Sequence, residues 1–204
     1  MKPILILVAL ISSIAGAAAS ETELDAFFPS VPIHEDDRLD GHYTIEITGC
    51  HVVVTETTRQ YVSVSHADLR YFETDPGRLA WPYGNRLSTR YLVAWNAHEV
   101  AQKENLNTLQ HDLRELRISW RDRKTLGADA LILKSEALKA KLLEIRNGVF
   151  GEAAQNNHTE RYLLHDETPV LVSVTLNISL QLPVQVKDMS ELAHAMYRHN
   201  LNCG

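Results

Sequence analysis

The stretch that decides the fold is residues 170–182, which reads VLVSVTLNISLQL. Every second residue of this stretch is Val, Leu or Ile, and the residues between them are mostly Ser, Thr, Asn or Gln. Strict alternation over this length predicts a strand with one buried and one largely exposed face. We therefore predict one long strand, and Pro183 either ends it or places it at a sheet edge.

Working outward toward the N-terminus, β-branched and aromatic residues predict three more strands. The first begins at His42 and continues through the valines at 52–54, with a bulge or bend where Gly49 interrupts the alternation. A second strand is predicted at 61–64 and a third at 87–95. Turn residues at 75–77 and 82–85 separate the second strand from the third.

Residues 97–147, inserted between these strands and residues 170–182, change to a helical period. Asn96 and Glu99 have the spacing of a capping box. Two apolar stripes follow, which consist of Leu106, Leu109, Leu113, Leu116 and Trp120, and of Leu131, Ser135, Leu138, Leu142 and Ile145. The second stripe ends at Asn147 and Gly148, a favourable pair for a helix C-terminus.

The second stripe is offset by one residue from the continuation of the first, which corresponds to a rotation of about 100° on a helix. One straight seam cannot serve both stripes. We favour an antiparallel helical hairpin that pairs the two stripes, with the break in the polar stretch 121–124. The alternatives are that each stripe packs on the sheet, or that a dimeric coiled coil absorbs the offset.

Asp188 and Glu191 again have capping-box spacing and predict a C-terminal helix. The fold class is therefore α+β, a single domain over 41–204 with a mostly antiparallel sheet, a helical hairpin insertion at 97–147 and a C-terminal helix packed on the sheet. This order of strands and a closing helix resembles the pleckstrin-homology type of small half-barrel. The resemblance concerns shape and implies no function.

Residues 1–19 have the order of a cleavable signal peptide. Lys2 precedes an apolar run, and small residues follow it up to Ala19. We predict cleavage between Ala19 and Ser20, and a product exported to the periplasm or the extracellular space. No second hydrophobic stretch reaches spanning length, so no membrane span is expected. Residues 20–40 are acidic and contain two prolines, which predicts an extended or disordered segment.

The chain has two cysteines, Cys50 and Cys203, and an oxidising compartment favours a disulfide between them. Such a long closed loop would stabilise the fold by up to about 5 kcal/mol. The full chain carries 20 basic and 26 acidic residues; without Lys2 the balance is 19 to 26, a formal charge of −7. This negative charge argues against a nucleic-acid partner, because phosphate binding needs a basic patch.

Ten histidines raise the question of a metal site. Neither a zinc-ligand spacing nor a nucleophile, phosphate-loop or cofactor motif is present, so we predict no catalytic residue, metal or cofactor. The His-x-Asp sequence at His66 and Asp68 is too common to indicate chemistry by itself. The histidine pairs nearest in sequence are His42 with His51, His158 with His165, and His194 with His199.

Two glycosylation sequons occur, at Asn157 and Asn177. They matter only in an organism that glycosylates exported proteins. Asn177 falls on the polar face of the predicted long strand, where a glycan would fit.

These observations lead to three hypotheses for function. The first is an exported, non-catalytic binding or assembly module that contacts a protein partner through the helical hairpin. The second is a carrier of a small apolar ligand, held between a helix and the apolar face of residues 170–182. The third is a hydrolase whose site assembles from residues scattered along the sequence.

Overall fold

A computed structural model gives the arrangement of the chain. It describes residue 24 and residues 32–34, 40–72, 83–85, 88–94, 105–165, 168–177, 179–183 and 189–203. The predicted signal peptide, the cleavage site between Ala19 and Ser20, and the first residues of both predicted capping boxes lie outside these residues. Within them, no helix is long and apolar enough to cross a bilayer.

The described strands form two antiparallel sheets. The larger sheet has the order β1-β2-β3-β4-β7-β8, with bounds β1 Pro32–His34, β2 Asp40–Thr48, β3 His51–Thr58, β4 Tyr61–Asp68, β7 His158–His165 and β8 Thr168–Leu176. The smaller sheet has the order β5-β6-β9, with bounds β5 Tyr83–Asn85, β6 Ser88–Ala94 and β9 Ser179–Pro183. The α+β class with an antiparallel sheet is therefore confirmed, and the pleckstrin-homology shape stays a prediction.

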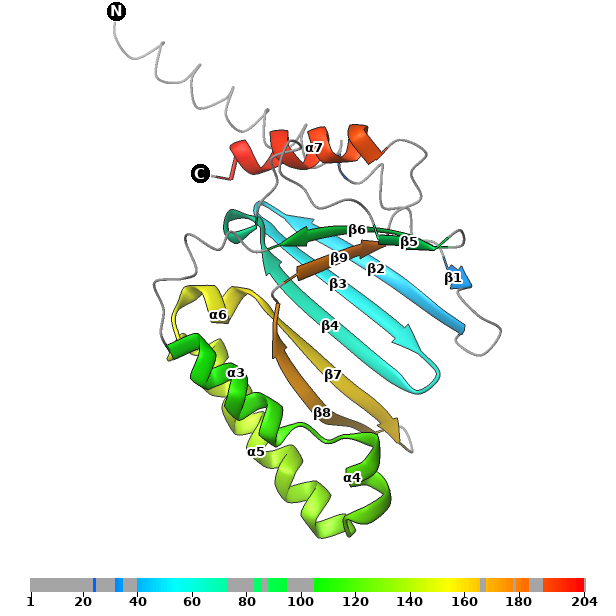
Figure 1. Ribbon diagram of the computed structural model, residues 1–204, viewed down its shortest axis with the longest axis vertical. Helices are drawn as coiled ribbons and strands as arrows, with labels where there is room; N and C mark the ends of the chain where they lie inside the picture. The colour runs from blue at the N-terminus through cyan, green and yellow to red at the C-terminus, as the bar shows by residue number, and fades with distance from the viewer. Residues whose placement is uncertain are drawn as a thin grey trace, which may run out of the picture.

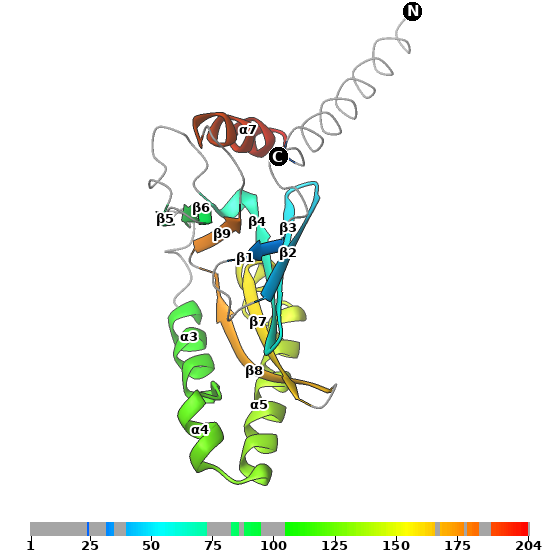
Figure 2. The same ribbon diagram turned by 90° about the vertical axis from the view of Figure 1, so that its right-hand side faces the viewer.

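The helices lie at two ends of the molecule (Figure 1). Next to β8 are α3, α4, α5 and α6, and at the opposite end is α7. Their bounds are α3 Asn105–Leu116, α4 Trp120–Thr125, α5 Ala128–Arg146, α6 Glu152–Asn156 and α7 Met189–Leu201. Figure 2, turned by 90°, shows the same separation along the long axis.

The bend predicted at Gly49 is a complete reversal of the chain. Thr48 pairs with His51, so Gly49 and Cys50 form a two-residue loop between β2 and β3. Gly49 has a φ of 57°, a conformation that tight hairpin loops require and that glycine adopts without strain. Ile47 lies opposite Val52, so the apolar residues before and after Gly49 lie on the same face of the sheet.

The single long strand predicted at 170–182 is wrong in one respect, because it is divided into β8 and β9. These two strands belong to different sheets, and the chain changes sheet at Asn177. The Asn177 backbone N–H donates to the Asn157 carbonyl, and its side-chain nitrogen donates to the His66 carbonyl. These bonds lie at the end of the β8 ladder, and the alternation of apolar and polar residues in the sequence continues past them, so the sequence pattern contains no sign of the break.

Residues 158–165, for which no strand is predicted from the sequence, form β7, an interior strand next to the edge strand β8. It pairs with β4 over six residue pairs and with β8 on its other side. A bulge interrupts the second pairing, since Arg161 pairs with Ser173 and Tyr162 with Leu171, so that Val172 has no opposite residue. The bulge bends β8, the last strand of the larger sheet.

Both predicted helical stripes pack against β8. The apolar core there joins Leu106, Leu109 and Leu113 of α3, Leu138, Leu142 and Ile145 of α5, and Leu171, Val172, Val174 and Leu176 of β8. Contacts also join α3 with α5. The stripes therefore serve the sheet as well as each other, which was an alternative at the sequence level.

The connection between the stripes is not a simple loop, because α4 forms within it. Ser119 caps α4 with its hydroxyl, and Asp122 returns a bond to the Ser119 N–H. The first stripe ends near Ile118, which is buried, whereas Trp120 is 64 % exposed. Trp120 is consequently not a member of the packed seam, contrary to the sequence expectation.

A second apolar core lies under α7. It contains Leu192, Ala193, Ala195 and Met196 of α7 together with Leu24, Val52, Val54, Ala67, Leu69, Phe72 and Leu182. Leu24, from the segment expected to be extended, is fully buried there. The predicted disulfide between Cys50 and Cys203 is present, and it joins the end of α7 to the β2–β3 loop. His199 reinforces this junction through a contact of 2.7 Å with the Gly49 carbonyl oxygen.

Replacing Cys50 and Cys203 together by alanine should lower the free energy of unfolding by about 3 kcal/mol, because the bridge closes a loop with a sequence separation of 153. Urea unfolding followed by circular dichroism measures this change. Reduction of the wild-type protein should produce a similar loss and serves as the control. An unchanged urea midpoint in both experiments would contradict a stabilising bridge.

Candidate functional site

An apolar groove lies between α4, α5 and the start of β8. Its volume is about 540 Å³. Its floor and walls are mostly apolar, and charged side chains stand at the rim. The groove is lined by Ile118, Arg123, Ala128, Leu131, Ile132, Ser135, Glu136, Lys139, Leu163, Pro169, Val170 and Val172.

The groove exists because α5 presents small residues where it crosses β8. Ser135 occupies a position of the apolar stripe that is otherwise filled by leucine or isoleucine, and its hydroxyl donates to the Leu171 carbonyl. The Ile118 N–H donates to the Val172 carbonyl. These bonds satisfy carbonyl groups at the bulged edge of β8 and hold the helices beside it, while the short Ser135 side chain leaves space above Val172.

The rim of the groove carries three charged residues. Lys139 forms an ion pair with Glu136 over 2.8 Å. Arg123, on α4, forms no ion pair with any residue in the described part of the chain. The groove therefore combines an apolar interior with one arginine at its edge that forms no ion pair among the described residues.

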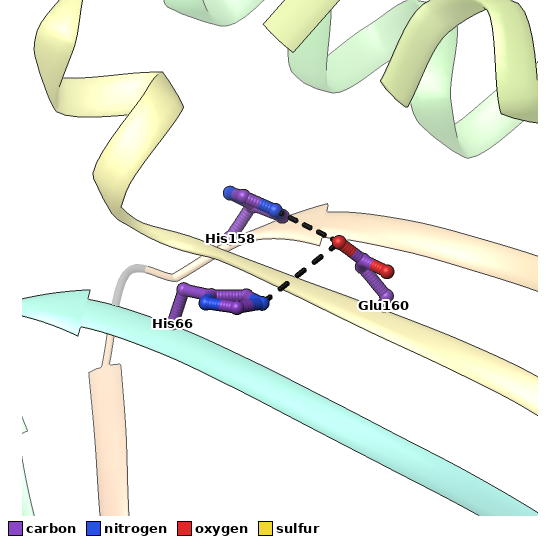
Figure 3. Close-up of side chains that lie close together, drawn as sticks. All are labelled: His66, His158 and Glu160. Carbon is purple, nitrogen blue, oxygen red and sulfur yellow. Dashed lines mark hydrogen bonds and ion pairs between the residues drawn. The ribbon is translucent and has the colours of Figure 1, made fainter. Parts of the chain in front are cut away.

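A second candidate is a polar cluster on the larger sheet, formed by His66, Arg146, His158, Glu160 and Tyr162. His66 on β4 lies directly opposite His158 on β7, and their rings stack with centroids 4.9 Å apart. Glu160 follows two residues after His158 and so shares its face of the strand. Figure 3 shows both imidazole rings directed toward the Glu160 carboxylate.

The Glu160 carboxylate is buried, with 2 % of its side chain exposed, and four groups surround it. Its Oε1 lies 3.1 Å from His158 Nε2, 3.9 Å from His66 Nε2 and 2.6 Å from a guanidinium nitrogen of Arg146. The Tyr162 hydroxyl donates to Oε2. Arg146, at the end of α5, thereby connects this helix to β7.

Burial by itself raises the pKa of Glu160, but hydrogen bonds from His158, Tyr162 and Arg146 outweigh it and hold this pKa at about 2. Burial and the bond to Glu160 raise the pKa of Tyr162 to about 12. Burial and the adjacent His158 lower the pKa of His66. At neutral pH the cluster therefore contains a buried carboxylate that is ionised and compensated by Arg146.

One ring nitrogen of the cluster lacks a partner. His158 is 4 % exposed, its Nε2 faces Glu160, and its buried Nδ1 has no hydrogen-bond partner. No serine, threonine or cysteine side chain among the described residues hydrogen-bonds to the rings of His66 or His158. The arrangement thus lacks the nucleophile of a Ser-His hydrolase in this part of the chain, and its donor set suits cation binding instead.

The sequence-level histidine pairs do not correspond to this cluster. In the sequence, His158 is paired with His165 and His66 is considered only with Asp68, whereas the structure places His66 opposite His158. His194 is exposed and contacts the Ser190 carbonyl, whereas His199 is buried at the disulfide junction. Asp68, two residues from His66, is instead bound by Arg70.

Both sequon asparagines are buried inside the domain. Asn157 is fully buried, and its side-chain nitrogen donates to the Ala153 carbonyl. Asn177 was expected on an exposed face but is 6 % exposed. Its side-chain nitrogen, the atom that a glycan would modify, donates to His66 as described above.

Glu160 was not singled out from the sequence, although a signal for it exists. His158, Glu160 and Tyr162 alternate with Thr159 and Arg161. If residues 158–165 are interpreted as a strand, this alternation places three polar side chains on one face. A strand with a polar face next to the long apolar strand indicates a buried polar network.

Comparisons with known proteins add no further assignment: no family model, no curated protein and no solved structure matches this chain.

Stability should fall in acid because of Glu160. Its pKa is depressed in the folded state, so its contribution is complete above the usual value of 4.5 and is lost as the pH falls toward 2. Between pH 6 and pH 3 the wild type should lose about 2 kcal/mol more than Glu160→Gln. Urea unfolding at both pH values measures the difference.

Glu144→Gln is the matched control for this experiment, because Glu144 is a half-exposed carboxylate paired with Lys141 on α5. It should retain the wild-type pH dependence. Equal pH dependence in Glu160→Gln and the wild type would show that the polar cluster does not stabilise the fold.

Proposed function

We propose that this protein is an exported, non-catalytic binding module whose ligand is a small apolar molecule held in the apolar groove. The observation that carries the proposal is the groove itself. Its volume of about 540 Å³ falls within the range of small-molecule sites, which span roughly 300–1,000 Å³. It includes Val170 and Val172 from the apolar face that the sequence nominated for ligand contact.

The groove differs from the closed pocket expected for a carrier. Exposed residues form its rim, including Ala128 and Ile132 of α5, and buried Ser135 and Val172 form its floor. The remainder of the β8 face is filled by leucines of α3 and α5. A ligand therefore occupies the first part of β8 only, and one end of it stays near water.

Arg123 indicates that the ligand carries an anionic group. It stands at the rim, and no described residue pairs with it. An anionic group at the exposed end of an apolar molecule would meet this guanidinium, as in a medium-chain carboxylate. The cysteine bridge and the absence of a spanning helix in the described residues are compatible with export.

Binding of the anionic apolar dye 1-anilinonaphthalene-8-sulfonate tests the groove. Ala128→Phe places a ring in the groove at the start of α5 and should weaken dye binding about tenfold or more. Fluorescence titration of wild type and variant measures the change. Displacement of the dye by decanoate should be lost in parallel.

Ala140→Phe is the control for added bulk, because Ala140 is an exposed residue of α5 that does not line the groove. Arg123→Gln should weaken binding of decanoate more than binding of decanol, and Arg121→Gln on the same helix should leave both unchanged. Equal dye affinity in the two alanine variants would remove the groove as the binding site.

A protein contact through the same helices is a second candidate function. Several large apolar side chains of the helices point away from both cores: Trp120 is 64 % exposed, Leu133 70 % and Leu143 59 %. The fold does not use these surfaces, and α5 consequently has apolar residues around its whole circumference. Exposed large apolar side chains of this kind are candidates for contacts with a partner.

The double variant Leu133→Gln/Leu143→Gln distinguishes this candidate from ligand binding. It should keep the wild-type melting temperature and dye affinity, since both residues are exposed outside the groove. In a pull-down from the exported fraction it should fail to retain proteins that the wild type and Ala128→Phe both retain. Identical retention by all three proteins would exclude a partner on this face of α5.

A further inference from the structure

The polar cluster contains a set of donor atoms whose geometry is close to that of a transition-metal site. Nε2 of His66, Nε2 of His158 and Oε1 of Glu160 lie on one face of the sheet, and suitable atoms of all three residues lie within 4.8 Å of one another. In a tetrahedral zinc site, bonds of about 2.1 Å place ligand atoms about 3.4 Å apart. The observed separations from Oε1 are 3.1 and 3.9 Å, so the three residues are close to that arrangement without a cation between them.

The backbone fixes these three side chains. His158 and Glu160 project from the same face of β7, and His66 projects from the position opposite His158 on β4. His158 and Glu160 are almost completely buried, so neither can turn toward solvent. Two imidazoles and one carboxylate are a ligand set that zinc and similar divalent ions accept, with further coordination positions open to water.

Arg146 compensates the carboxylate and is the most exposed member of the cluster. Its side chain is 52 % exposed and approaches from the end of α5. A divalent cation at Oε1 would displace the guanidinium, whose exposed side chain can turn into water. His66, one third exposed, gives the cation a route from solvent.

We propose that His66, His158 and Glu160 form a binding site for a divalent transition metal of the zinc type, and that the cation exchanges with the Arg146 guanidinium at Glu160. Cation binding at Nε2 of His158 would place the ring proton on Nδ1, which is buried and has no hydrogen-bond partner among the described residues. The assignment therefore rests on the distances between the three residues and on their chemistry as ligands. The site is separate from the apolar groove, and its existence does not depend on the proposed function.

Titration calorimetry with ZnCl₂ tests the site, using the disulfide-bonded protein prepared without a polyhistidine tag. The wild type should bind one equivalent of Zn²⁺. His66→Phe keeps a ring against His158 but removes one donor, and it should weaken binding about tenfold or more. His111→Phe is the matched control, because His111 is an exposed histidine of α3, and it should bind Zn²⁺ as the wild type does.

Arg146→Met tests the exchange, because removal of the guanidinium should raise the affinity for Zn²⁺. Without the guanidinium, no charge-assisted bond must break when the cation enters, so Zn²⁺ should bind about tenfold more tightly than to the wild type. A purely structural arginine would instead leave affinity unchanged or lower it. Saturating Zn²⁺ should also raise the melting temperature of Arg146→Met by about 5 °C. This shift is a second measurement of Zn²⁺ binding that does not depend on a comparison with the wild type.

Two results would overturn the proposal. One is equal Zn²⁺ affinity in the wild type and His66→Phe, which would assign the binding to other histidines. The other is an absence of Zn²⁺ binding in Arg146→Met, the variant in which the carboxylate is not compensated. Circular dichroism of each variant establishes that it is folded before the titrations are compared.

Discussion

The antiparallel pairing of β4 with β7 is the constraint on which the rest of the structure depends. It joins residues 61–66 to residues 158–163 and so closes a chain segment of about ninety residues that contains the inserted helices. The pairing places His66 opposite His158 and buries Glu160 on the same face of β7. A carboxylate at that depth is costly unless it is compensated, and the end of α5 supplies Arg146 for that purpose. The buried Glu160 therefore requires the end of α5 to lie close enough for Arg146 to reach it.

The edge strand β8 forms one side of the apolar groove. An exposed edge offers free backbone groups, and here α5 and the segment before α4 cover part of it through Ser135 and Ile118. A leucine in place of Ser135 would fill the space over Val172 but could not bond to the Leu171 carbonyl. Ser135 thus satisfies a carbonyl group at the bulged edge of β8 and also leaves the apolar groove open.

Sequence patterns predicted where helices and strands occur better than they predicted which of them pair or pack together. Alternation identified residues 170–182 as extended and the leucine stripes as helical, because those periods are local. The change of sheet at Asn177 could not be predicted, since a strand can turn into another sheet without altering its alternation. The polar cluster was missed for a related reason: residues 158–165 resembled a loop, and the contact between His66 and His158 depends on a register that one sequence does not reveal. Cysteine count predicted the bridge because two thiols allow only one pairing.

The core under α7 has a consequence for how the protein is made. Most of its strand residues lie within 52–72, whereas Leu182, Leu192 and Met196 come more than a hundred residues later. A ribosome releases the chain from its N-terminus, so β2, β3 and β4 emerge long before the residues that cover them. Their apolar face must remain uncovered throughout that interval. Folding of this half is therefore a late event, which must wait until the C-terminal helix has been synthesised.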